Sequence, residues 1–132
     1  MTQIIRIEHP GDGIGIWADR HYNAFSFYPE MEDLHDSFPN PIQEGYNLGE
    51  DEYCATISVA QFQKWLLPEW MDELIHKYGF KIYLLTMKTC VVLKHQVVYR
   101  KEDIISSTDI SSLFCSPLDL YTRDTEEINI DL

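Results

Sequence analysis

The stretch "FKIYLLTMKTCVVLKHQVVY", residues 80–99, decides the fold class of this chain. Along its first half, Phe80, Ile82 and Leu84 alternate with residues that point the other way. A period of two residues is typical of a strand, because successive side chains of a strand face opposite sides. Short lysine-containing steps separate this run from two further apolar runs, "CVVL" and "QVVY". We therefore predict a three-stranded antiparallel meander joined by tight turns.

Residues 59–78, just before this stretch, have a helical pattern. Ser58 and Gln61 fit a capping box, in which the serine hydroxyl accepts a hydrogen bond from the N–H of Gln61. Pro68 suits the first turn of a helix, where its missing N–H is not needed. Gly79 is a typical residue for a helix end. Either two helices meet next to Pro68 or one helix kinks there.

Residues 3–8, "QIIRIE", alternate well enough to form one more strand. We predict a single α+β domain over residues 1–115, in which this strand and the meander form an antiparallel sheet packed against one kinked helix or two short helices. The domain includes a long acidic loop, residues 29–52, and is followed by an acidic, loosely ordered tail, residues 116–132. The predicted core consists of Phe62, Trp65, Leu66, Leu74, Ile82, Leu84, Val92 and Val97.

The charge of the chain is strongly negative and unevenly distributed. The 132 residues have a formal net charge of −12. Residues 21–63 contain eight Asp and Glu and no Lys or Arg, whereas residues 77–101 contain six Lys and Arg and no acid. A chain of this charge repels nucleic acid, so its expected partners are basic protein surfaces. A homodimer, in which residues 77–101 of one copy meet the acidic loop of another, is a further alternative.

Several classes of protein are not indicated by the sequence. The apolar runs are too short to span a membrane, and the first residues do not resemble a secretory signal, which predicts a cytoplasmic protein without a membrane partner. Cys54, Cys90 and Cys115 are far apart and form no C-x-x-C pair, which predicts reduced thiols. No two histidines have H-x-x-x-H spacing. We therefore predict no metal site and no cofactor.

Three glycines, Gly11, Gly13 and Gly15, follow the first strand in "RIEHPGDGIGIW", residues 6–17. Their spacing is not that of the dinucleotide fingerprint G-x-G-x-x-G, and the residues after them do not have the pattern of a helix. Phosphate binding by such a loop needs a helix N-terminus behind the last glycine. The stretch is therefore predicted to be a bend in the chain.

The acidic loop is the predicted binding site, weighed against a solvated surface loop with no partner. Dense carboxylates would speed the encounter with a basic surface and make binding sensitive to salt. Nearby aromatic side chains would act as anchors. The predicted partner-binding residues are Glu30, Glu32, Asp33, Asp36, Glu44, Glu50, Asp51 and Glu52, with Tyr28 and Tyr46 as anchors.

A scattered set of polar residues resembles the site of ADP-ribosyltransferases. The first strand offers a basic residue, Arg6 or His9, and a middle strand ends in a hydroxyl residue, Ser58 or Thr56. Gln96 lies on a late strand. The resemblance implies that Arg6 would hold a nicotinamide dinucleotide and that Ser58 would position it. Gln96 occupies the place where that family usually has the glutamate that helps to ionise the glycosidic bond. The alternative function is thus a small transferase-like or nicotinamide-nucleotide-binding protein.

Three further stretches, "IIRIEHPGDGIG", "SVAQFQKWL" and "HQVVY", resemble small accessory proteins of bacteriophages. The short length and the acidity also resemble anti-CRISPR and other anti-defence inhibitors. The resemblance implies a non-catalytic protein that acts in the cytoplasm of the host cell. There it would block the basic, nucleic-acid-binding surface of a host protein without binding nucleic acid itself.

Overall fold

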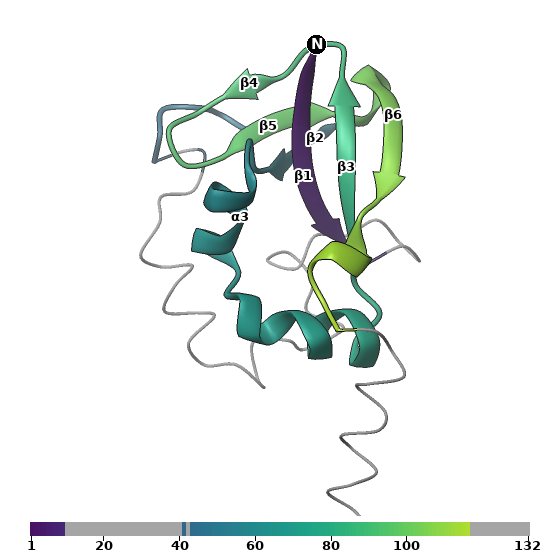
Figure 1. The fold of residues 1–132 in the computed structure, drawn as a ribbon. Helices are drawn as coiled ribbons and strands as arrows, with labels where there is room; N and C mark the ends of the chain where they lie inside the picture. The colour runs from purple at the N-terminus through teal and green to yellow at the C-terminus, as the bar shows by residue number, and fades with distance from the viewer. Residues whose placement is uncertain (10–40, 42, 117–132) are drawn as a thin grey trace, which may run out of the picture.

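The computed structural model describes residues 1–9, 41 and 43–116, and these residues form two antiparallel sheets and several short helices (Figure 1). The strands are β1 Thr2–Glu8, β2 Glu52–Ala55, β3 Lys81–Met87, β4 Val91–Val92, β5 Val97–Arg100 and β6 Ile104–Asp109. The helical elements are α3 Val59–Trp65, the 3₁₀ turns η1 Pro68–Trp70, η3 Lys101–Asp103 and η4 Ser111–Leu113, and a π-helical turn, η2 Glu73–Lys77. The predicted α+β class is confirmed. The glycine bend at residues 11–15 and the tail from residue 117 lie outside the described residues.

The first sheet has the order β1-β3-β6, with β3 in the middle. β1 and β3 are antiparallel over their whole length, from Thr2 opposite Met87 to Glu8 opposite Lys81. Residues 4–7 of β1 are all buried, because both faces of this strand are covered. Ile5 and Ile7 contribute to one core cluster and Ile4 to the other, as the alternation of "QIIRIE" predicts.

The second sheet has the order β2-β5-β4, and in Figure 1 its strands β4 and β5 run across the direction of β1 and β3. The predicted pairing of "CVVL" with "QVVY" is confirmed by the β4–β5 ladder. The predicted pairing of "FKIYLLTM" with "CVVL" is wrong, because β1 and β6 occupy the two edges of β3. Sequence reasoning missed β6, "IISSTD", whose side chains are mostly exposed and polar.

Most of the predicted core residues are buried, with one clear error. Val97 on β5 is fully buried, whereas its register partner Val92 on β4 is 57% exposed. Leu84 is only partly buried, although it packs against the first core cluster. Val92 is exposed because β4 is an edge strand of two residues and, within the described residues, pairs with β5 alone.

The helical region consists of two segments, which decides between the alternatives left open by the sequence. Ser58 caps α3 by accepting a hydrogen bond from the N–H of Gln61 at 3.1 Å, as predicted. The Gln61 side chain reaches back to the N–H of Ile57 at 2.9 Å. α3 ends where Leu66 adopts an extended conformation, and Pro68 begins the second segment. That segment ends at Gly79, whose φ of 78° favours glycine.

Contacts from β1 to the end of β2 join the two sheets. Ile5 and Thr56 form an isolated antiparallel bridge, with backbone N···O distances of 2.7 and 2.9 Å. Next to it, the guanidinium Nη1 of Arg6 donates to the carbonyl oxygen of Cys54 at 2.8 Å. Arg6 is 7% exposed, and its Nε lies 3.7 Å from a carboxylate oxygen of Glu8. A buried cation on β1 therefore holds the backbone of β2.

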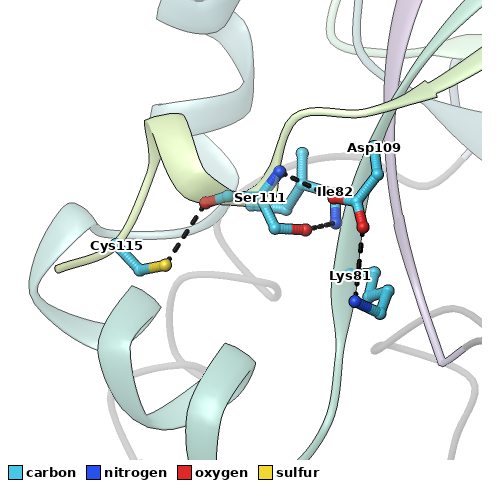
Figure 2. A network of polar contacts seen from close by, with 5 residues as sticks. All are labelled: Lys81, Ile82, Asp109, Ser111 and Cys115. Atoms are coloured by element: carbon cyan, nitrogen blue, oxygen red, sulfur yellow. Dashed lines mark hydrogen bonds and ion pairs between the residues drawn. The ribbon is translucent and has the colours of Figure 1, made fainter. Parts of the chain in front are cut away.

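The turn η4 is fastened to the first sheet by the polar network drawn in Figure 2. Asp109, the last residue of β6, accepts a hydrogen bond from the N–H of Ser111 at 2.9 Å, and its other oxygen lies 3.3 Å from Nζ of Lys81. The Ser111 hydroxyl accepts from the N–H of Ile82 at 2.9 Å. The Ser111 carbonyl accepts a hydrogen bond from the thiol of Cys115 at 3.3 Å. The network thus fixes the path of the chain from β6 to Cys115.

We expect Asp109→Ala to lower the free energy of unfolding by about 1 kcal/mol near neutral pH, because it removes the hydrogen bond from the N–H of Ser111. Hydrogen bonding to Ser111 holds the pKa of Asp109 below its usual value of 3.8. A lowered folded-state pKa contributes stability that is present above 3.8 and disappears as the pH falls through the folded-state pKa.

Urea unfolding of the wild-type and Asp109→Ala proteins near neutral pH and in strong acid tests this expectation. The difference between the two proteins should shrink in acid. Lys81→Met is the control, because it removes only an exposed ion pair and should change stability little. A difference that persists unchanged in strong acid would contradict the role of the carboxylate.

Candidate functional site

Glu44 fastens the described part of the acidic loop to the turn between β4 and β5. One of its carboxylate oxygens accepts a hydrogen bond from the N–H of His95 at 2.9 Å, and the other accepts from the amide of Gln96 at 3.0 Å. Gln96 is 5% exposed. Both oxygens of Glu44 are therefore engaged within the protein, and the residue positions the loop.

Glu52 closes the turn that leads into β2. It accepts hydrogen bonds from the hydroxyl of Tyr46 and from the N–H of Gly49, the latter at 2.8 Å. The Tyr46 hydroxyl, followed by the Gly49 N–H, lowers the pKa of Glu52, and the same contact raises the pKa of Tyr46. Near neutral pH, Glu52 is therefore ionised and Tyr46 is neutral. The hydrogen bond between the two side chains stabilises the turn.

Exposed carboxylates gather at the end of the second sheet, where two distant segments meet. Glu52 is the register partner of Arg100, so the turn before β2 lies beside the turn after β5. Arg100 lies within an ion-pair distance of three carboxylates, at 3.6 Å from Asp51, 4.0 Å from Glu52 and 3.7 Å from Glu102. We call the exposed carboxylates Glu50, Asp51 and Glu102 the acidic end.

Arg100 and Lys101, which lie next to the acidic end, are both engaged within the protein. Arg100 is shared among the three carboxylates, and Nζ of Lys101 lies 4.7 Å from the centre of the Tyr53 ring. An arginine shared among several carboxylates cannot neutralise all of them. The acidic end therefore keeps an excess of negative charge.

The predicted binding site includes Glu50 and Asp51 of the acidic end but not Glu102. Glu102 is about fifty residues from them in the sequence, and only the antiparallel register of β2 and β5 brings it near. The register is not evident from the sequence, because β2 has only four residues, "EYCA". Five other predicted residues lie outside the described residues, namely Tyr28, Glu30, Glu32, Asp33 and Asp36.

The three residues of the transferase alternative each contact a different structural partner. Arg6 holds the Cys54 carbonyl. Ser58 caps α3. The side-chain amide of Gln96 donates to Glu44 at 3.0 Å, and its backbone carbonyl oxygen accepts from the N–H of Leu93 at 2.8 Å. These contacts account for all three side chains by their role in the fold and add no support for a transferase site.

An apolar groove of about 310 Å³ lies between α3 and η4. No charged side chain of the described residues lines it, and two of its lining residues, Phe62 and Phe114, meet edge to face with their ring centres 5.2 Å apart. The groove is thus a separate feature from the acidic end.

These features define a small, acidic α+β protein with a group of exposed carboxylates. The family of the Bacteriophage T4 Y00F protein matches residues 1–112, so the chain belongs to this bacteriophage family. The predicted resemblance to small phage proteins is confirmed at this level. No curated protein and no solved structure matches the chain. None of the helices in the described part of the chain is long and apolar enough to cross a membrane.

Proposed function

We propose that this phage protein is a non-catalytic inhibitor that binds a basic, nucleic-acid-binding surface of a host protein. The observation that supports the proposal most is the acidic end, where Glu50, Asp51 and Glu102 are exposed at the end of the second sheet. Negative charges at fixed positions compete with phosphates for lysine and arginine side chains. The net charge of −12 adds long-range attraction to such a surface.

The internal contacts of the loop explain why its carboxylates divide into two groups. Glu44 and Glu52 hold the loop and the turn in place, so they keep the exposed carboxylates in one arrangement. A preorganised surface loses less conformational entropy on binding than a mobile one. The proposal therefore assigns partner contact to the acidic end and positioning to Glu44 and Glu52.

The proposal is tested by capturing proteins from a lysate of the bacterial host on the immobilised full-length chain. We expect the captured partner to be a nucleic-acid-binding protein. Added double-stranded DNA should release it from the immobilised chain. The triple variant Glu50→Gln/Asp51→Asn/Glu102→Gln should weaken capture by at least about tenfold, since each charged contact of an interface contributes to binding. Binding by the wild type should also weaken as salt is raised.

Glu69→Gln is the control, because Glu69 is an exposed carboxylate on η1 and not part of the acidic end. It should leave capture unchanged. The proposal fails if DNA does not compete with the chain for its partner, or if the triple variant binds as well as the wild type at every salt concentration.

A further inference from the structure

Asp72, His76 and Cys115 form the one group of possible metal ligands found among the described residues. Their ligand atoms lie within 4.8 Å of one another, and all three residues are half-buried. Asp72 directly precedes η2 and His76 lies within it, four residues later, so the two share one face of the helical segment. Cys115 comes from the other side, just after η4.

The backbone of Ser116 contacts both Asp72 and His76 and keeps their side chains close together. Its N–H donates to Oδ1 of Asp72 at 2.6 Å, and its carbonyl oxygen lies 2.6 Å from Nε2 of His76. Metal-binding histidines are commonly held in this way, with one ring nitrogen bonded to a backbone carbonyl, which fixes the tautomer and the orientation of the ring. Supporting contacts of the kind found around metal ligands are therefore present.

The position of Cys115 is fixed independently by the network of Figure 2. Its thiol donates to the Ser111 carbonyl, and Ser111 is fastened to Asp109 and Ile82. Burial, followed by the negative charges of Asp72 and Asp109, raises the pKa of the Cys115 thiol. Because it donates to the Ser111 carbonyl, Cys115 carries its proton as a thiol in this arrangement.

We infer that Asp72, His76 and Cys115 bind a Zn²⁺ ion, which joins the chain after η4 to the second helical segment. Imidazole nitrogen, thiolate sulfur and carboxylate oxygen are the ligands that zinc takes in proteins, whereas Mg²⁺ and Ca²⁺ require oxygen ligands. On binding, the thiol loses its proton to solvent and leaves the Ser111 carbonyl, and a Zn–S bond forms. The charges of thiolate and carboxylate balance the two positive charges of the ion.

The geometry requires only a small adjustment. Zinc bonds of about 2.0–2.3 Å in a tetrahedral arrangement place ligand atoms roughly 3.3–3.8 Å apart. The three ligand atoms therefore need to approach by at most about 1–1.5 Å, which side-chain rotation provides. Three protein ligands leave a fourth position for water.

The test uses the purified full-length protein, stripped with a chelator and then titrated with Zn²⁺ by calorimetry and with Co²⁺ by absorption. We expect one ion per chain and a thiolate-to-Co²⁺ charge-transfer band. Cys115→Ser should abolish the band and weaken Zn²⁺ binding by at least about tenfold, and His76→Gln should weaken binding similarly. Zn²⁺ should raise the melting temperature of the wild type and not that of Cys115→Ser.

Cys90→Ser is the matched control, because Cys90 is also a half-buried free thiol but lies outside the group. It should bind Zn²⁺ and Co²⁺ as the wild type does. Far-UV circular dichroism in the presence of chelator checks that each variant folds, and the two ligand variants keep the test decisive if one of them does not. The inference is overturned if the wild type binds no ion at a one-to-one ratio, or if Cys115→Ser binds with unchanged affinity.

Discussion

Replacing Phe62 by alanine is expected to lower the free energy of unfolding by about 3–5 kcal/mol, which is the usual loss for an aromatic residue in a core. Phe62 on α3 is 2% exposed and belongs to the first core cluster. Its ring also packs edge to face against Phe114 after η4, so the substitution leaves a cavity between two elements that other residues cannot easily fill. Because small domains have total stabilities of about 5–15 kcal/mol, this loss is large.

Urea unfolding followed by the fluorescence of the buried Trp65 and Trp70 measures the effect. Val92→Ala is the control and should change the free energy of unfolding by less than about 0.5 kcal/mol, because Val92 is 57% exposed. If Phe62→Ala does not fold, Phe62→Leu gives a smaller, measurable loss. A loss below about 1 kcal/mol for the alanine variant would show that Phe62 is not part of a packed core.

Replacing Arg6 by methionine is expected to lower the free energy of unfolding by about 3 kcal/mol. The substitution removes the hydrogen bond to the Cys54 carbonyl, which joins the two sheets, and it leaves Glu8 without its buried cation. Breaking a buried pair by removing one partner is strongly destabilising, because the other charge stays in the protein without compensation. The side chain of Glu8 is 18% exposed, so water offsets part of the loss.

The double variant Arg6→Met/Glu8→Gln separates the two contributions. Neutralising Glu8 should recover about 1 kcal/mol or more of the loss, and the remainder measures the link from β1 to β2. Chemical denaturation of the wild type, the two single variants and the double variant completes the cycle. If Arg6→Met alone unfolds at the same urea concentration as the wild type, the buried arginine does not hold the sheets together.

The sequence predicts those parts of the fold that depend on neighbouring residues. The Ser58 cap, the helix end at Gly79 and the two faces of β1 and β3 follow from local spacing, and all of them are present. Pairing between distant strands does not follow from local spacing. The two backbone edges of any strand can pair, so the sequence of β3 does not say which strands flank it, and β6 gives no apolar pattern by which to recognise it.

The candidate site is likewise predictable only in the part that depends on neighbouring residues. The acidity of residues 44–52 is evident in the sequence, but the sequence does not distinguish carboxylates that point outward from those that hold the loop. Glu44 differs from Glu50 only through its contacts with the β4–β5 turn. In the same way, Asp72 and His76 are recognisable as helical neighbours, whereas Cys115 joins them only through the path of the chain after β6.

The pairing of β1 with β3 also determines what happens to the chain during its synthesis. Thr2 lies opposite Met87, and β6 completes the sheet only with Asp109. The isoleucines of β1 are thus translated early, whereas β3, their partner strand among the described residues, follows only at residues 81–87. Contacts over such sequence separations form slowly and expose apolar surface in the meantime. A ribosome that stalls before residue 81 would therefore carry a β1 segment suited to aggregation or to capture by a chaperone.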